Sequence, residues 1–214
     1  MTNACTSDQR KRTSPADLSV SVHLATLATE FGGQIIPQYA RNANAEFIHH
    51  GNIVLTGSHR SNPWIEVYEP YLNFELQQDP HSGAPQFLNR SPQLHEAAVY
   101  AIPASLDTPG AEEKELTSYG VLALLKGCGD RGFLVLDEGL NMQGTEAVGD
   151  LITEASRNTS LLASAMASMI AYGVCDMVLA SRIVGGGRCE LVCRFAKNIA
   201  NRFPNHFSKI SLWK

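Results

Sequence analysis

The sequence predicts an α+β fold in which a mixed or antiparallel sheet packs against helices. Three observations support this: a helical apolar periodicity near the N-terminus, several short runs of β-branched and aromatic residues, and two apolar arms joined by a glycine triplet near the C-terminus. The chain has 214 residues, of which 44% are hydrophobic and 18% charged. A soluble globular protein that buries a substantial core without disulfides or metals is therefore expected.

The first predicted element is a helix that begins at Pro15. Ser14 is a suitable N-cap, and proline is favoured at the first helical position. Glycines at 32 and 33 are expected to end the helix. Its apolar face consists of Leu18, Val22, Ala25 and Leu27. Residues 1–14 are polar, with a basic cluster at 9–12, and are expected to form a flexible tail.

Strand candidates follow at residues 45–57 and 63–77, where β-branched and aromatic residues partly alternate with polar ones and Pro70 marks a break. Residues 77–92 and the segment from Thr108 are rich in turn-forming residues and are expected to be loops. Between them, residues 96–104 form a short strand candidate.

The second half of the chain shows clearer signals. Residues 112–127 predict a helix, with acidic residues in the first turn and a glycine at the end. The run 133–136 predicts the first arm of a hairpin, with a turn at 137–139 and a second arm from Leu140. A long helix with one face of small side chains is expected over 159–172.

The strongest hairpin signal lies at residues 175–195, where two apolar arms are joined by Gly185, Gly186 and Gly187. A terminal helix is expected from Ala196, broken near Pro204. Since no long linker is evident, residues 15–214 are predicted to form a single domain, with a sub-boundary near 104–111 as the alternative.

The order helix, hairpin, long helix, hairpin, helix across residues 112–214 resembles the roadblock and longin-like family of small α/β modules. The segments that carry the resemblance are GFLVLDEGLNMQG, NTSLLASAMASM and SRIVGGGRCELVCRF. The resemblance implies a dimerising platform for a small GTPase or another protein partner. It carries over no catalytic residue.

Charge and cysteine usage limit the classes of partner and compartment. The net charge is −4 at pH 7 without long single-sign runs, so nucleic acid is an unfavourable partner. Five scattered cysteines lack the paired spacing of zinc sites and fit reduced thiols in a cytoplasmic protein. The apolar stretch 161–180 contains Gly173 and Asp176 and is assigned to a buried helix and strand, so no membrane association is expected. Neither a cofactor nor a metal ion is expected.

Histidines gather in the stretch FIHHGNIVLTGSHR, residues 47–60. His49 and His50 are neighbours, so on a strand they would face opposite sides and could not bind one metal together. If the run after them folds into a hairpin, one of them could face His59, with Ser58 as nucleophile and Arg60 holding an anion. The alternative is that these are polar residues flanking a strand.

An acidic pair, Asp137 and Glu138, follows an apolar run and resembles the magnesium-binding strand end of nucleotide hydrolases. The chain contains no phosphate-binding GxxxxGK[ST] loop, so exposed carboxylates in a hairpin turn are the favoured interpretation.

Three weaker chemical signals remain. Glycines 185–187 with Arg188 could hold a phosphate but are favoured as a turn. Cys189 and Cys193 are expected to be buried, and Cys128, near two basic residues, is the best reactive-thiol candidate. The aromatic residues Trp64, Tyr68, Tyr71 and Phe74 predict either core packing or, where exposed, a partner surface.

Two hypotheses of function follow, and the residues leave open whether the protein is an enzyme. The first, slightly preferred because no complete catalytic motif is present, is a non-enzymatic regulatory or assembly module that binds a protein partner or a second copy of itself. The second is a small hydrolase or transferase that uses His49, His50 and His59 with Asp137 or Glu138. The enzyme requires these groups to converge beside a cavity, whereas the binding module requires an exposed apolar patch.

Overall fold

The computed structural model describes residues 13–49, 51–94, 96–102, 117–126, 132–155, 174–184 and 188–195. Several sequence predictions therefore lie outside the described residues: most of the N-terminal tail, the long helix over 159–172, the glycine turn at 185–187 and the terminal helix from Ala196.

The larger of the two sheets in the described residues is five-stranded and mixed, with the order β1-β6-β5-β7-β8. β1 runs parallel to β6, and every other neighbouring pair is antiparallel. Its strands are β1 (Ile53–Thr56), β5 (Thr117–Lys126), β6 (Phe133–Gly139), β7 (Val174–Val184) and β8 (Arg188–Phe195).

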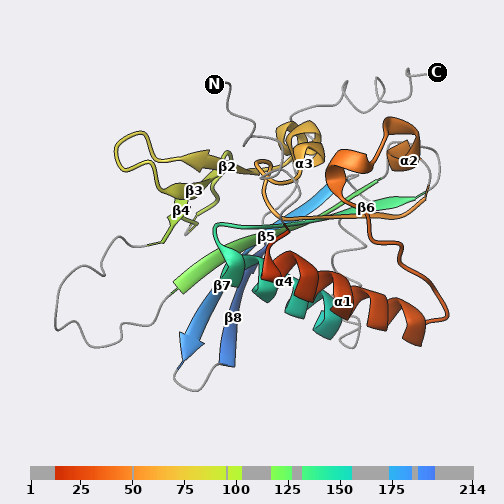
Figure 1. Ribbon diagram of the computed structural model, residues 1–214. Coiled ribbons are helices and arrows are strands. Elements are labelled where there is room, and N and C mark those ends of the chain that lie inside the picture. The colour runs from red at the N-terminus through yellow and green to blue at the C-terminus, as the bar shows by residue number, and fades with distance from the viewer. Residues whose placement is uncertain are drawn as a thin grey trace, which may run out of the picture.

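The smaller sheet is an antiparallel three-stranded unit with the order β2-β3-β4. Its strands are β2 (Phe74–Gln78), β3 (Pro85–Asn89) and β4 (Val99–Ala101). Phe74 and Tyr100 of this sheet pack in one cluster with Val121 of β5 and Leu140, so the smaller sheet lies against one end of the larger one (Figure 1).

Helices cover both faces of the larger sheet, so the predicted α+β class with a mixed sheet is confirmed (Figure 1). α1 (Pro15–Glu30) and α4 (Met142–Ala155) pack together on one face, which we call the α4 face. The opposite face, called the α3 face, carries α2 (Ala45–His49), α3 (Pro63–Tyr68) and two 3-10 turns, η2 (Ala40–Asn42) and η3 (Glu69–Tyr71). The main apolar core lies under the α3 face and joins Ile48, Ile65, Tyr68 and Leu72 to the sheet residues Leu55, Ala123, Leu125, Leu134 and Leu136.

The prediction of α1 is confirmed in its boundaries and its cap. The Ser14 hydroxyl accepts a hydrogen bond from the Asp17 N–H, and the Asp17 carboxylate accepts one from the Ser14 N–H, which forms a capping box. The buried side of the helix consists of Ala16, Val20 and Leu24. Leu18 and Val22, expected on the apolar face, are exposed instead.

The helix predicted over residues 112–127 is wrong for its described part, since residues 117–126 form strand β5. β5 is a central strand of a sheet whose two faces are both covered by packed elements, so its apolar residues occur without strict alternation. Burial still alternates, with Val121, Ala123 and Leu125 fully buried.

The hairpin predicted at residues 133–140 is also wrong, because β6 continues through Gly139 and the chain then enters α4. Asn141 begins this helix: its side-chain oxygen accepts hydrogen bonds from the Gly144 N–H at 3.0 Å and the Ser118 hydroxyl at 2.5 Å. Residues 137–139 are therefore strand and not turn.

The strand predictions in the first half are only partly confirmed. Residues 45–49 form α2, and only 53–56 form a strand. Asn62 caps α3 by accepting the Trp64 N–H at 3.2 Å, and Pro63 occupies the first turn, so the next strand begins only at Phe74. The loop predicted over 77–92 contains β3.

The two remaining strand predictions are confirmed: β4 lies within 96–104, and β7 and β8 pair antiparallel with Val184 opposite Arg188. Within the described residues, no helix is both long and apolar enough to cross a membrane.

Candidate functional site

The candidate site lies where the parallel strands β1 and β6 end. The carboxyl ends of parallel neighbours meet at one edge of a sheet, and the loops that follow them commonly form binding sites. Here β1 is followed by a loop over residues 57–62, and β6 leads through Leu140 and Asn141 into α4. The Gly57 N–H donates to the Asp137 carbonyl at 3.0 Å and ties the two strand ends together.

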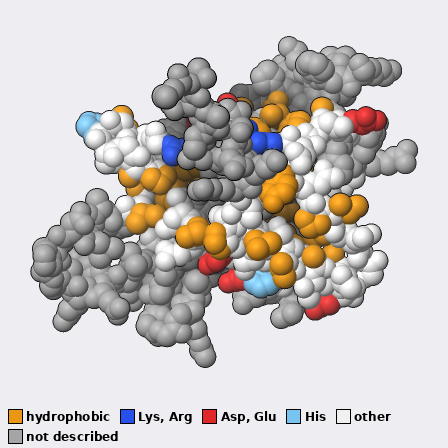
Figure 2. All heavy atoms as spheres, viewed as in Figure 1, with side chains coloured by type: hydrophobic (Ala, Val, Ile, Leu, Met, Phe, Trp, Pro, Cys, Tyr) orange, Lys and Arg blue, Asp and Glu red, His pale blue; other side chains and the backbone are white. Residues whose placement is uncertain are grey.

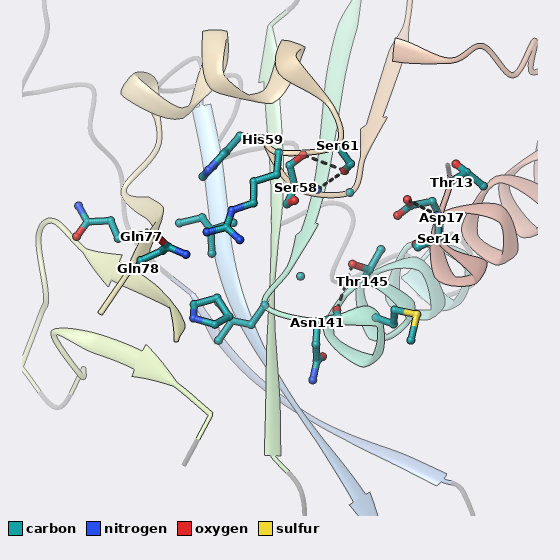
Figure 3. A pocket seen from close by; sticks show the side chains of 17 residues that line it. Thr13, Ser14, Asp17, Ser58, His59, Ser61, Gln77, Gln78, Asn141 and Thr145 are labelled. Carbon is teal, nitrogen blue, oxygen red and sulfur yellow. Dashed lines mark hydrogen bonds between the residues drawn. The ribbon is translucent and has the colours of Figure 1, made fainter. Parts of the chain in front are cut away.

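The loop after β1 is a compact turn that carries His59. Gly57 has a φ of +104°, and a Cβ there would lie 2.7 Å from the Ser61 hydroxyl, so only glycine fits without strain. The Ser61 hydroxyl donates to the Ser58 carbonyl at 3.0 Å and accepts from the Ser58 N–H at 3.2 Å. These bonds close the turn around His59 and Arg60 (Figure 3).

Three ionisable side chains converge on the α3 face: His59, Glu69 and Glu138, called the His–Glu–Glu group below. His59 Nδ1 lies 3.3 Å from Glu69 Oε1 and 4.0 Å from Glu138 Oε1. One ligand atom from each of the three residues lies within 4.8 Å of the other two. The group joins residues from the β1 loop, η3 and β6 that are up to 79 positions apart in the chain.

Glu69 is held by backbone donors and by Arg90. Its Oε1 accepts the Leu76 N–H at 3.2 Å. Arg90 Nη1 donates to the carbonyls of Glu69, Pro70 and Leu72 at 3.1, 3.2 and 2.9 Å. Arg90 Nη2 also pairs with the Glu75 carboxylate at 2.6 Å. Arg90 therefore fixes the 3-10 turn from which Glu69 projects.

Glu138 is buried and lacks a full set of hydrogen bonds. Its Oε1 accepts the His59 N–H at 3.2 Å, whereas its Oε2 has no hydrogen-bond partner among the described residues. Burial and then the nearby charge of Glu69 raise the pKa of Glu138 from its ordinary 4.5 to about 8, against the opposing effect of the His59 N–H. At neutral pH the Glu138 carboxyl therefore holds a proton when nothing is bound beside it.

Asp137, the preceding residue, points to the α4 face because side chains alternate along a strand. Its Oδ2 accepts the Thr56 hydroxyl at 3.2 Å, and its Oδ1 has no hydrogen-bond partner among the described residues. Burial raises the pKa of Asp137 well above its usual range, Thr56 lowers it, and the charges of Asp17 and Glu138 raise it further. Asp137 is thus separated from the His–Glu–Glu group by the sheet.

A cavity of about 570 Å³ lies beside the site, and His59 forms part of its wall (Figure 3). Its lining combines polar and apolar residues from the loops after β1 and β6, the starts of α1 and α4, and strands β2 and β3. The polar lining residues are Thr13, Ser14, Asp17, Ser58, His59, Arg60, Ser61, Gln77, Gln78, Asn141 and Thr145. Neither Glu69 nor Glu138 lines the cavity, so the His–Glu–Glu group borders it through His59.

The structure brings together only part of the predicted site. His59 and Glu138 converge, and Ser58 and Arg60 line the cavity with His59. His49 ends α2 and so is not on a strand as predicted, and His50 lies outside the described residues. The interpretation of Asp137 and Glu138 as exposed turn residues is wrong, since both are fully buried in β6.

Glu69 was missed by the sequence analysis. The available signal was a carboxylate between two tyrosines and next to Pro70, in a segment otherwise expected to be buried. A buried carboxylate requires partners, so its position in an apolar segment could have indicated a site.

The other chemical signals stay predictions or prove structural. Cys128 and Gly185, Gly186 and Gly187 lie outside the described residues. Cys189 and Cys193 belong to β8, opposite Ile183 and Leu179 of β7. Tyr68 and Phe74 are core residues, and Trp64 and Tyr71 pack against the core, so this aromatic group is mainly structural.

No protein-family model matches the chain, and no curated protein or solved structure matches it either. The roadblock-like arrangement of the C-terminal half stays a prediction.

Proposed function

We propose that the protein is a hydrolase that acts on a small polar substrate in the cavity beside His59. The observation that carries this proposal is the convergence of His59, Glu69 and Glu138 at the carboxyl ends of β1 and β6, next to that cavity. Buried ionisable groups with shifted pKa values are enriched at catalytic sites, because burial is otherwise unfavourable for them.

The cavity suits a small molecule with hydrogen-bonding groups. Its volume of about 570 Å³ falls within the range of small-molecule sites. Ser58, Ser61, Asn141 and Thr145 offer hydroxyl and amide groups, and Arg60 offers a positive charge for an anionic part of the substrate. The substrate would meet the His–Glu–Glu group through His59, whose side chain is 29% exposed.

In the proposed reaction, a water molecule at the His59 edge of the cavity attacks the substrate. The His–Glu–Glu group takes a proton from this water and returns it to the leaving group as the scissile bond breaks, while Arg60 stabilises negative charge on the substrate. Glu69 acts on the reaction by orienting the imidazole through its contact with Nδ1. A transferase, which would pass part of the substrate to an acceptor other than water, would need the same His59, Glu69 and Glu138 side chains.

The test is a screen of chromogenic esters, amides, phosphate esters and glycosides with the wild-type chain, His59→Ala and Glu138→Gln. Both variants should lower kcat/KM by roughly 100-fold or more, as expected for loss of an acid or base group. His23→Ala is the matched control, because His23 is an exposed histidine with a carboxylate partner, Asp150 at 3.8 Å, and does not line the cavity. A substrate turned over equally by all four proteins would contradict the proposal.

We also propose, as a second candidate function, an assembly role in which the chain binds a second copy of itself or another protein. The supporting observation is the outward side of α1, where Leu18 and Val22 are 57% and 54% exposed and lie one helical turn apart. Apolar side chains gather over this face of the molecule (Figure 2). We place the protein in the cytoplasm under either proposal, where reduced cysteines are the rule.

Light scattering after size-exclusion chromatography tests the assembly role. A self-associating wild type should become monomeric in Leu18→Asp and Val22→Asp. Val67→Asp, at an equally exposed apolar residue of α3, serves as the control. An unchanged mass in all variants would exclude α1 as the self-association surface.

A further inference from the structure

We propose that His59, Glu69 and Glu138 bind a divalent transition-metal ion, with His59 Nδ1 and one or both carboxylates as ligands. The inference deepens the proposed function, on which it rests for its role in catalysis but not for metal binding itself. The sequence predicted no metal site, because the three residues share no local spacing and Glu69 went unnoticed.

The donor atoms are spaced as ligands of one ion require. Bonds of about 2.0–2.2 Å from a tetrahedral ion to nitrogen and oxygen place neighbouring ligand atoms roughly 3.3–3.6 Å apart. His59 Nδ1 and Glu69 Oε1 are already 3.3 Å apart. Glu138 Oε1 lies 4.0 Å from Nδ1, so its carboxylate would have to move slightly closer to His59 to bind the same ion.

Charge and hydrogen bonding also favour a cation. A divalent ion would displace the proton held at Glu138 and balance the two negative charges of the deprotonated carboxyl groups. The side chain of Glu138 is only 1% exposed, so water does not reach Oε2. This oxygen also has no hydrogen-bond partner among the described residues. An ion bound through both oxygens of the Glu138 carboxylate would supply the partner that Oε2 lacks.

The carboxylates are already oriented, as metal ligands usually are. Glu69 Oε1 accepts the Leu76 N–H and Glu138 Oε1 accepts the His59 N–H, each at 3.2 Å. Arg90 holds the turn that carries Glu69. The site is therefore built on a strand, a 3-10 turn and a closed loop that are packed against the main core.

The donor set indicates the kind of ion. An imidazole nitrogen favours zinc and other transition metals, whereas magnesium and calcium prefer oxygen-only sites. Three protein ligands leave a coordination position for water, as in catalytic zinc sites. Since His59 borders the cavity, this water would be the nucleophile of the proposed hydrolysis, made acidic by the ion.

The competing arrangement is a metal-free group in which the two carboxylates and the imidazole share a proton. Binding measurements separate the two arrangements. Zn²⁺ and Co²⁺ are suitable probes, because Zn²⁺ reports affinity by calorimetry and Co²⁺ reports its ligands in the visible spectrum.

The experiment uses the full chain after treatment with a chelator and alkylation of its five cysteines, which removes thiolates as ligands. We expect one Zn²⁺ per chain and Co²⁺ bands typical of nitrogen and oxygen ligands. Mg²⁺ at the same concentration should not compete.

Glu138→Gln is the decisive variant, because glutamine has nearly the size and shape of glutamate and should preserve the fold. It should weaken Zn²⁺ binding by more than about 100-fold, since even outer partners of metal ligands contribute roughly 10–100-fold. Glu69→Gln gives a second test should the first variant fold poorly. The matched control is Glu146→Gln on the exposed side of α4, which should bind as the wild type does.

Absence of stoichiometric binding by the wild type, or binding that survives both Glu138→Gln and Glu69→Gln, would overturn the inference. The proposed function fails separately: Zn²⁺ binding that depends on Glu138 without hydrolysis of any substrate class leaves the metal site standing. Hydrolysis that persists after chelation, with no metal bound, leaves the hydrolase standing and removes the metal.

Discussion

Asp137 and Glu138 are neighbours on β6, both buried, yet the two faces of the sheet give them different surroundings. Glu138 meets Glu69 and His59 on the α3 face, beside a cavity. On the α4 face, Asp137 accepts a hydrogen bond from the Thr56 hydroxyl and lies near the charge of Asp17 in α1. Each carboxylate has one oxygen without a hydrogen-bond partner among the described residues.

The comparison shows that burial alone does not make a carboxylate functional. Both residues have raised pKa values, and burial is the first cause in each case. Only Glu138 has an imidazole and a second carboxylate within reach of one ion. The arrangement of donors from other elements therefore decides which of the two can take part in chemistry.

The largest expected effect tests how closely the α4 face is packed. A Cβ at Gly120 would meet the Gly144 carbonyl and lie 2.6 Å from Val148 Cγ2, so Gly120→Val should force α4 away from β5. We expect a loss of about 3 kcal/mol in the free energy of unfolding, measured by urea denaturation. Gly83→Ala, where the space is open and only the positive φ of 70° opposes a side chain, should lose about 1 kcal/mol. Equal losses would show that α4 does not pack closely on Gly120.

The next largest effect is the pH dependence of the free energy of unfolding, which Glu138 and Asp137 both influence. With a folded-state pKa of about 8, Glu138 keeps a proton that the unfolded chain releases above pH 4.5. Unfolding then releases a proton, so the stability that Glu138 contributes is full below about pH 4.5 and is lost as the pH rises towards 8. In chelator-treated protein the contribution should fall by about 1 kcal/mol per pH unit between these limits.

Glu138→Gln should flatten that part of the stability curve, because the substituted side chain does not titrate. Asp137→Asn should flatten it as well, since the pKa of Asp137 is also raised. Denaturation curves from pH 5 to 8 measure both. A Glu138→Gln curve as steep as the wild type would mean that Glu138 is ionised throughout.

A smaller effect is expected from Thr56→Val, which removes the hydroxyl that donates to Asp137 at 3.2 Å. Leaving a buried acceptor unsatisfied should destabilise the fold by about 1–2 kcal/mol. The pKa of Asp137 should rise further, because Thr56 lowers it. Thr153→Val, which removes a hydroxyl that donates to the Gly149 and Asp150 carbonyls within α4, is the control for losing a threonine hydroxyl. Thermal unfolding and nuclear magnetic resonance titration provide the two readouts. A neutral Thr56→Val would show that Asp137 does not depend on this bond.

The smallest effect concerns the start of α1, which brings Asp17 near Asp137. Ser14→Ala removes the hydroxyl that accepts the Asp17 N–H at 3.0 Å and should lower stability by about 1 kcal/mol. Ser14→Thr keeps the cap and should restore most of the loss. Calorimetric melting measures both variants, and the same melting temperature for alanine and threonine would contradict the capping role.

The structure confirms the sequence predictions that depend on only a few neighbouring residues. Ser14 with Pro15 located the start of α1, and the apolar arms on either side of the glycine triplet located β7 and β8. The errors occurred where neighbours in space decide the outcome. β5 resembles a helix in isolation because its apolar residues are nearly continuous, and its central position in the sheet explains that pattern. Glu69 was missed since its partners come from distant segments.

By itself, the sequence determined the α+β class, the capped first helix, the C-terminal hairpin and the presence of His59 and Glu138 among the candidate residues. These depend on periodicity, capping and turn chemistry, which operate within about ten residues. Only the tertiary structure decided that Asp137 and Glu138 lie on opposite faces, that Glu69 joins His59, and that β1 lies parallel to β6. The physical reason is that strand pairing and burial bring together groups up to 81 residues apart, as Thr56 and Asp137 are, and no local pattern encodes those distances.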